Sequence, residues 1–249
     1  MFVYIYGEGC FSERFSCEQR YHTKKTFLLS VWIFFPGCDS DVRCRNDSGA
    51  PVDWYILYKY PHKAKQPGSG LKYLYMDDRT NGWILSSKII NESGALANTL
   101  KPLLDFYTKH FGYILYNDQP PKPCPASSSH GHSKGVVMLD TQTGVWLSHS
   151  TPKFPAYRNR NFWPNNGNRN AQTFLCVTFP HATFRDIGKQ LKYIHVYPFD
   201  YYIPTDFPKE LGCLTKQGCY PTTSPWFRIA TLTSNAGRKF YSFAKYSRF

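Results

Sequence analysis

Short runs of β-branched and aromatic residues, each closed by proline, glycine or a polar turn, constrain this chain more than any other feature. Residues 52–59 lie between Pro51 and Pro61 and are expected to form a strand. Residues 71–76 follow a Pro-Gly-Ser-Gly turn, so they are expected to pair with that strand. Further strands are expected at 111–116, 135–140, 145–148 and 173–179, with 135–140 and 145–148 forming a hairpin across residues 141–144. Phe and Tyr contribute 19 residues each, which favours a sheet over a helical bundle.

Two segments between these strands have helical periodicity. In residues 94–107 leucines recur at spacings of three and four, and in residues 184–193 Ile187 and Leu191 share one face. Because helices alternate with strands, we expect an α/β fold, an α+β mixed sandwich, and not an all-β fold. Residues 157–170, rich in Asn and Arg, are expected to form a surface loop.

The first forty residues read as a leader. Lys24 and Lys25 precede about ten apolar residues, and Cys38 and Ser40 place small residues at the third and first positions before a possible cleavage point, the order of a secretory signal. Residues 1–21 are too long for the region that precedes the apolar run of an ordinary signal. A start codon placed too early or a short hydrophobic anchor would explain them. For the apolar run itself, a buried strand is the other alternative. We therefore expect a leader at 1–40 and one domain at 41–249. No apolar run reaches the 18 residues of a membrane-spanning helix, so stable membrane insertion is not expected.

The cysteines also favour export. Without the leader five of the eight remain, an odd number, so one is free or has its partner elsewhere: Cys44, Cys124, Cys176, Cys213 and Cys219. None has CxxC or zinc-finger spacing, which favours disulfides over a metal. Two glycosylation sequons, at Asn46 and Asn91, have meaning only in a secreted chain.

The charge of the chain indicates a polyanionic partner. Its 30 Lys and Arg against 17 Asp and Glu give a net charge of +13, which suits nucleic acid or an anionic membrane surface. The sequence contains no phosphate-binding loop, no nucleophile elbow, no HExxH and no dinucleotide fingerprint, and its acidic residues do not cluster as in a two-metal nuclease. We therefore expect no cofactor and no metal, which leaves histidine as the candidate catalyst.

The informative histidine lies in His132-Ser133-Lys134, at the start of an expected strand. Alternate strand residues point to one side, so the imidazole and the ammonium can face one phosphate. The imidazole can attack phosphorus, and the lysine can neutralise the oxygens of the transition state. Gly135 is expected to leave room for the substrate backbone. The same pattern at His22-Thr23-Lys24 precedes the leader's apolar run and is expected to be inert.

Eight segments, in order, closely resemble deoxyribonuclease II and together extend through residues 44–249: CRNDSGAPVDWYILYKYP from Cys44, GALANTLKPLL from Gly94, YILYNDQPP from Tyr113, GHSKGVVMLD from Gly131, WLSHSTPKFP from Trp146, QTFLCVTF from Gln172, GKQLKY from Gly188 and FYSFAK from Phe240. The resemblance implies a phospholipase D-like fold, here the N-terminal half plus the start of the second, with a central mixed sheet flanked by helices. It also implies hydrolysis of DNA at acid pH without a metal ion, leaving 3′-phosphate ends.

In that family two halves each supply an HxK histidine to one active site. The first motif falls on His132 and Lys134, and the family's disulfide falls on Cys44 and Cys176. The second HxK is expected after Phe249, where this sequence stops, and His181-Ala182-Thr183 cannot replace it because it has no lysine. Three alternatives remain open: a homodimer that completes the site, a truncated gene model, or a protein that no longer cuts DNA.

Several other residues are candidates for the site, and each also has a purely structural alternative. His149 is expected to line the cleft or to be hydrogen-bonded in the core. Asn117, Asp118 and Gln119 are turn residues that could instead position a phosphate or the histidine. Asp140 is a candidate for orienting His132, or else ends a strand. Four basic residues are candidates for following the DNA backbone: Lys153, Arg158, Arg160 and Arg169.

These inferences predict a secreted or lysosomal nuclease-fold protein, with DNA as its partner. His132 is expected to be the nucleophile or the general acid, and Lys134 to hold the phosphate. The alternative is a catalytically inactive nucleic-acid-binding or host-interaction protein of the same fold. A phospholipid-acting protein is disfavoured because the chain has no exposed amphipathic anchor.

Overall fold

The computed structural model describes residues 42–63, 69–104, 111–159, 161–216 and 218–249. The leader expected at residues 1–40 lies outside the described residues. In the described part of the chain, no helix has both the length and the apolar character needed to cross a membrane.

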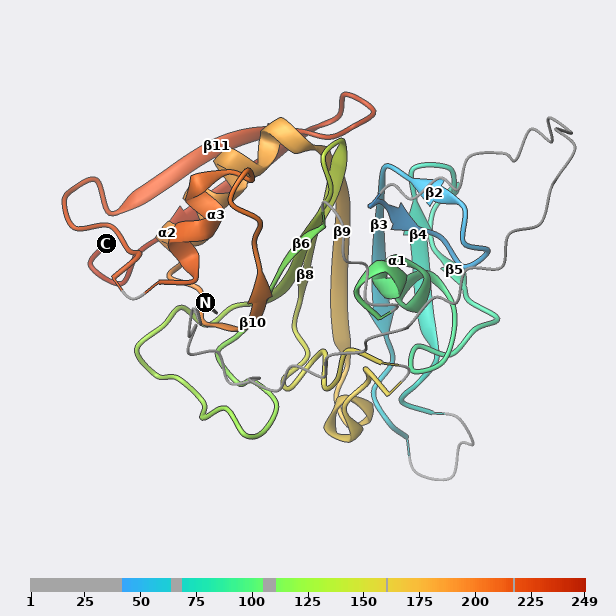
Figure 1. Cartoon of the computed structure of the whole chain (residues 1–249). Helices are drawn as coiled ribbons and strands as arrows, with labels where there is room; N and C mark the ends of the chain where they lie inside the picture. Colours follow the sequence, from blue (N-terminus) through green and yellow to red (C-terminus); the bar gives the residue numbers. More distant parts are fainter. Residues whose placement is uncertain (1–41, 64–68, 105–110, 160, 217) are drawn as a thin grey trace, which may run out of the picture.

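An eight-stranded sheet forms the centre of the molecule (Figure 1). In spatial order its strands are β10 (Pro198–Tyr202), β6 (Gly112–Asn117), β7 (Lys134–Leu139), β8 (Thr143–His149), β9 (Gln172–Pro180), β3 (Trp54–Lys59), β4 (Tyr73–Asp77) and β5 (Ile84–Leu85). The predicted α/β class and the predicted strands are confirmed, including the pairing of β3 with β4 and the β7–β8 hairpin.

The prediction of a mixed sheet is wrong in one respect, because every pairing among the described strands of the sheet is antiparallel. Parallel neighbours need a crossover connection, usually a helix. Here β6, β7, β8 and β9 follow one another in space and in sequence through loops and a hairpin, so no crossover separates them.

Both faces of the sheet are covered, and β6 and β7 show this most clearly because all their residues are buried. Tyr113 and Leu115 of β6 point into the core on one face, and Ile114 and Tyr116 into the core on the other. Helix α1 (Ala95–Leu104) packs its leucines into the first core. A strand covered on both faces reads as a continuous apolar run, as residues 112–116 do.

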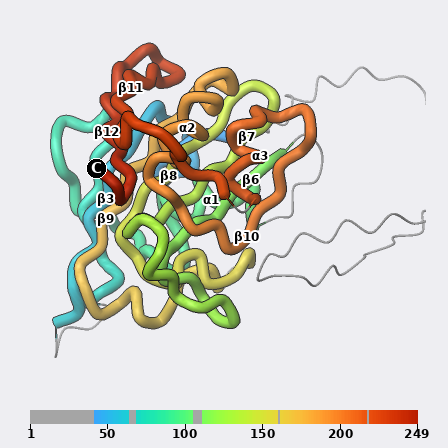
Figure 2. The backbone as a smooth tube through the Cα atoms, turned by 90° about the vertical axis from the view of Figure 1, so that its left-hand side faces the viewer, coloured from blue at the N-terminus to red at the C-terminus, as the bar shows by residue number. Residues whose placement is uncertain are grey.

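The second face is covered by α2 (Phe184–Ile194), by α3 (Lys209–Leu214) and by a separate hairpin, β11 (Phe227–Thr233) with β12 (Lys239–Lys245). Figure 1 shows β11 on the far side of α2 from the sheet, and Figure 2 views the molecule from that side. The two helices expected at 94–107 and 184–193 are thus present, although residues 105–110 are outside the described part.

The loop expected at 157–170 is only partly a surface loop. Phe162 and Trp163 are buried against Phe154 and Phe174, next to a short 3₁₀ turn at Asn165–Asn168. Aromatic rings that can reach the core bury more area than an exposed loop allows, which overrides the polar composition of the segment.

Two disulfides are seen among the described residues. Cys44, in the short strand β1 (Cys44–Arg45) that pairs with β2 (Pro51–Val52), is bonded to Cys176 of β9, as the family resemblance implied. Cys213 and Cys219 form a local bridge. Cys124 is also disulfide-bonded, so it is not a free thiol.

Loss of the Cys44–Cys176 bridge should cost far more stability than loss of the local bridge. The two bonds span 132 and 6 residues, for which loop-closure entropy gives about 5 and about 2 kcal/mol. Urea unfolding of the two double alanine variants, Cys44→Ala/Cys176→Ala and Cys213→Ala/Cys219→Ala, measures this difference. Equal losses would contradict a stabilisation set by loop length.

Candidate active site

One carboxylate joins the two members of the HxK pair. Asp118 follows β6 directly and Lys134 opens β7, the neighbouring antiparallel strand. The Asp118 Oδ2 atom lies 2.7 Å from His132 Nδ1, and its Oδ1 atom accepts a hydrogen bond from Lys134 Nζ. The carboxylate therefore holds both side chains of the motif at the point where the long loop 118–133 leaves and rejoins the sheet.

The three side chains differ sharply in exposure. The His132 side chain is 82% exposed, whereas Lys134 is 4% and Asp118 9% exposed. Since Asp118 accepts from Nδ1–H, the neutral imidazole carries its free lone pair on Nε2. A nucleophilic or basic nitrogen is thus presented to solvent from a fixed ring.

Of the two alternatives that the sequence left open for Asp118, a turn residue or one that positions the histidine, the contact with His132 Nδ1 favours the second. The available signal was its position directly after a strand that was expected to lie beside the HxK strand. The loop itself is internally bonded, with Ser127 N donating to Asp118 O at 2.8 Å and Asp118 N to Ser133 O at 3.3 Å. These bonds hold Asp118 opposite the motif.

Asn117 has the role expected of a turn residue and also anchors a neighbouring loop. It is fully buried, and its Oδ1 accepts from Gln119 N at 2.9 Å. Its Nδ2 donates to the carbonyls of Thr151 and Phe154. Asn117 therefore supports the site from behind through the backbone, and its side-chain amide is engaged there.

His149 is a core residue beside the site. It packs between Phe154 and Phe174, and its Nδ1 accepts from Thr151 N at 3.2 Å. Burial, and secondarily the charge of Lys134, lower the pKa of His149 to about 3. The ring stays neutral in mild acid, and its Nε2 is buried without a hydrogen-bond partner among the described residues. Of the two roles expected for His149, lining the cleft or bonding within the core, the structure shows the second.

The structure favours the strand-ending alternative for Asp140, and the expectation for Gly135 is not met. Asp140 follows the opposite end of β7 from Lys134, where its carboxylate accepts from the amides of Val42, Gln142 and Thr143. It closes the turn and does not orient His132. A side chain at Gly135 would collide with the Tyr116 ring, so this glycine makes room for core packing and not for substrate.

The basic candidates separate into different environments. Arg158 pairs with the buried Asp200 at 2.8 Å and lies over the Tyr113 ring. Arg169 is exposed beside the 3₁₀ turn, and Arg160 is outside the described residues. Lys153 is exposed and lies next to the site, since its amide donates to Gln119 O at 2.8 Å.

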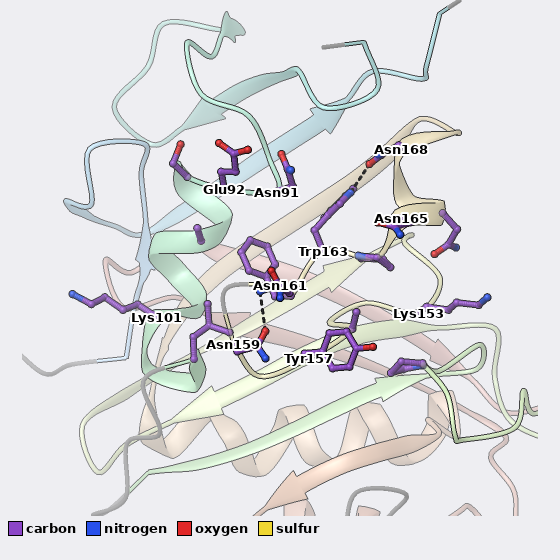
Figure 3. A pocket seen from close by; sticks show the side chains of 18 of the residues that line it. Asn91, Glu92, Lys101, Lys153, Tyr157, Asn159, Asn161, Trp163, Asn165 and Asn168 are labelled. Carbon is purple, nitrogen blue, oxygen red and sulfur yellow. Dashed lines mark hydrogen bonds between the residues drawn. The ribbon is translucent and has the colours of Figure 1, made fainter. Parts of the chain in front are cut away.

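Lys153 also borders a large polar pocket of about 1390 Å³ between α1 and the segment 153–168 (Figure 3). The pocket is rich in amides and holds three lysines and one glutamate. The pocket reaches Pro121 and Lys122 of the loop that carries His132. Its lining includes Asn91, Glu92, Lys101, Tyr157, Asn159, Asn161, Trp163, Asn165 and Asn168. Amide donors with lysines suit a phosphate and sugar backbone.

Across the described ranges, no group of three or more His, Cys, Asp and Glu side chains is placed to hold a metal ion.

Comparison with known proteins identifies the family. A model of the family "Deoxyribonuclease II" matches residues 43–249. The chain belongs to the deoxyribonuclease II family. It is 39% identical to deoxyribonuclease-2-alpha of Rattus norvegicus over 90% of this chain and 66% of that protein. It is 35% identical to deoxyribonuclease-2-beta of Homo sapiens, over 89% and 64%, and 34% identical to plancitoxin-1 of Acanthaster planci, over 90% and 64%.

The chain therefore spans slightly less than two thirds of the length of these deoxyribonuclease II relatives.

The buried neutral His149 should make this deoxyribonuclease II chain less stable in acid. Its pKa of about 3 in the folded chain lies below the ordinary value of 6.5, so as pH falls through this window the unfolded chain takes up a proton that the folded chain does not. Stability is thus lost between pH 6.5 and 3, by at most about 1.4 kcal/mol per pH unit. Replacing His149→Phe should flatten the fall in urea-unfolding free energy from pH 7 to pH 4.

The exposed His62 provides the control, since His62→Gln should leave that fall unchanged. An equally steep loss in His149→Phe would show that other groups dominate the acid sensitivity.

Proposed function

We propose that this chain is a deoxyribonuclease II-type endonuclease that hydrolyses DNA phosphodiesters at acid pH without a metal ion and leaves 3′-phosphate ends. The observation that carries the proposal is the exposed imidazole of His132 held by the buried Asp118. The family membership and the names of the relatives, deoxyribonuclease-2-alpha and deoxyribonuclease-2-beta, support DNA as the substrate.

In the proposed reaction His132 Nε2 attacks phosphorus, and the P–O5′ bond breaks. A second imidazole donates the proton that the 5′-oxygen takes, and the phosphoryl group stays on the 3′-oxygen as a phosphohistidine. Water then attacks phosphorus, its proton passes to the second imidazole, and the P–N bond breaks. This order of bond breaking accounts for 3′-phosphate ends. Asp118 is a positioning residue, because its bond to Nδ1 directs Nε2 toward the phosphate.

Lys134 is proposed to stabilise the charge that develops on the phosphate oxygens. Its ammonium has three donors, of which one bond goes to Asp118. When Nε2 bonds to phosphorus the His132 ring becomes cationic, so this ring and the Lys134 ammonium, with Asp118 between them, leave one net positive charge that offsets the charge on the phosphate oxygens. The buried position of Lys134 keeps that charge out of bulk water, where it would be screened.

The two-histidine mechanism requires a second imidazole, and residues 42–249 contain one HxK motif. A homodimer is one source, since two copies would bring two His132 rings to a shared site. A longer polypeptide that includes this sequence is the other. In the homodimer case the specific nicking rate rises with protein concentration around the dimer dissociation constant.

We also propose that the protein acts outside the cytosol, in the secretory path or the lysosome. The bridges Cys44–Cys176 and Cys213–Cys219 persist in oxidising compartments. The leader-like residues 1–40 and the sequons at Asn46 and Asn91 support export and glycosylation.

Replacing His132→Ala should abolish DNA cleavage while leaving DNA binding largely intact, because the side chain is exposed and makes one bond. Plasmid nicking at acid pH with a chelator present should fall at least about a hundredfold. Binding measured at pH 7 should keep its salt dependence. His62→Ala, which removes another exposed imidazole, should nick normally. Undiminished nicking by His132→Ala would remove this residue from the mechanism.

If the unaltered, fully oxidised protein does not nick at any concentration but still binds DNA, the alternative is favoured: a non-catalytic nucleic-acid-binding or host-interaction protein of the same fold. The single HxK in residues 42–249 is the observation behind that alternative.

The polar pocket is proposed to hold the DNA backbone beside the scissile phosphate, with Lys153 as one cationic contact. Replacing Lys153→Ala should lower the slope of log affinity against log salt for duplex DNA by about 0.9. Lys239→Ala removes an exposed lysine from the turn end of the β11–β12 hairpin, which is the end opposite to Trp226 and Tyr246, and should leave the slope unchanged. An unchanged slope in Lys153→Ala would place the DNA elsewhere.

A further inference from the structure

Six aromatic side chains gather around His130, which lies in the same loop as His132. We call them the aromatic cluster, and they are His130, His195, Tyr197, Tyr220, Trp226 and Tyr246. The rings of His130 and His195 stack with centroids 4.4 Å apart, and His130 lies 4.7 Å from Tyr197. The edge of His195 meets Tyr220 at 5.2 Å and Tyr246 at 5.4 Å.

The cluster also contains two nearly parallel tyrosine rings and a tryptophan ring tilted by 36° to one of them. Tyr220 and Tyr246 are 2° from parallel with centroids 5.8 Å apart, and Trp226 lies 6.2 Å from Tyr246. The guanidinium of Arg248 is 5.3 Å from the centre of the Trp226 ring. Tyr220 is 36% exposed, and Trp226 and Tyr246 are half-buried, so these rings present faces or edges to solvent.

The cluster is attached directly to the proposed site. His130 precedes His132 by two residues, and the intervening Gly131 donates from its amide to His195 O at 2.8 Å. A side chain at Gly131 would collide with the carbonyl of Ile194, so this close approach requires glycine. Segments distant in sequence thus meet where the nucleophile emerges.

The segments that supply the rings of the cluster are basic in composition, although Asp118 borders the first of them and contacts His132. The three segments that supply its rings, 119–139, 187–199 and 211–249, contain no aspartate or glutamate. Burial lowers the pKa of both His130 and His195, so their stacked rings are neutral at pH 7. Neutral flat rings beside cations, with no acidic side chain in the same segments, match the face of a nucleobase attached to a phosphate backbone.

We propose that the aromatic cluster binds unpaired nucleobases next to the scissile phosphate, by stacking on Tyr220, Trp226 and Tyr246. The inference rests on the proposed function, because it takes DNA as the substrate. The expected ligand is single-stranded or locally opened DNA, because the faces of bases inside a duplex are covered by their neighbours. The polar pocket and the cluster would then contact the strand on the two sides of His132.

The test compares two ligands with equal backbones. A labelled twelve-nucleotide oligothymidylate and an abasic oligonucleotide of the same length carry the same phosphates, and only the first has bases. Their affinities for the His132→Ala chain are measured by fluorescence anisotropy at pH 7. The His132→Ala substitution removes the proposed nucleophile and so prevents cleavage, and a chelator excludes metal-dependent contaminants. Stacking of a single base predicts at least about fivefold tighter binding of the oligothymidylate.

Trp226→Ala and Tyr246→Ala, each in that background, should bring the two affinities together by weakening the oligothymidylate alone. Trp226→Leu keeps apolar bulk without an aromatic face, so it reports on stacking if the alanine variant does not fold. Tyr241→Ala is the matched control, because Tyr241 is 66% exposed on the outer face of the β11–β12 hairpin and should leave the preference intact.

Equal affinities of the unmutated cluster for both ligands, or a preference that survives both Trp226→Leu and Tyr246→Ala, would overturn the proposal. Loss of the preference in Tyr241→Ala as well would overturn the assignment to this cluster. The proposed nuclease function is judged separately, by plasmid nicking with the unaltered chain, so a chain that never nicks but prefers bases supports stacking alone.

Discussion

The organisation of the site depends on one carboxylate with two cationic or hydrogen-bonding partners. Asp118 is buried, and a buried unpaired carboxylate is costly, so its bond to the buried Lys134 contributes to folding, while its bond to the exposed His132 orients that ring. The exposed ring of His132 would otherwise sample many orientations. A surface histidine acquires a defined tautomer because the partner that holds it is not itself at the surface.

The antiparallel sheet brings these groups together. Its central strands are covered on both faces, which specifies the register because a slip of one residue would exchange the two cores. The register places Asn117 opposite Lys134 and therefore Asp118 beside the motif. Asn117 then ties the loop at 151–154 behind the site, and the same loop brings Lys153 to the polar pocket. Core packing thus determines the geometry of the surface that is proposed to meet DNA.

Local patterns were reliable guides where one physical signal dominated. The apolar run of β6, the leucine spacing of α1 and the turn between β7 and β8 all predicted the elements that form. The sequence analysis went wrong at Phe162 and Trp163, where a polar segment contains two core rings, and at Gly135, whose close neighbour Tyr116 lies on the adjacent strand. It left Asp140 between two alternatives, of which the strand-ending turn residue is the one observed. It was incomplete after residue 193, where the hairpin that carries Trp226 and Tyr246 was not foreseen.

The sequence by itself determined the family, the HxK pair and the strong positive charge, because motif order and residue counts do not depend on how the chain packs. Only the tertiary structure decided that Asp118 orients His132, that His149 is a neutral core residue, and that Arg158 is paired with Asp200. Each of these depends on burial and on distances between segments that are far apart along the chain, and a sheet in which both faces are covered is what sets those distances.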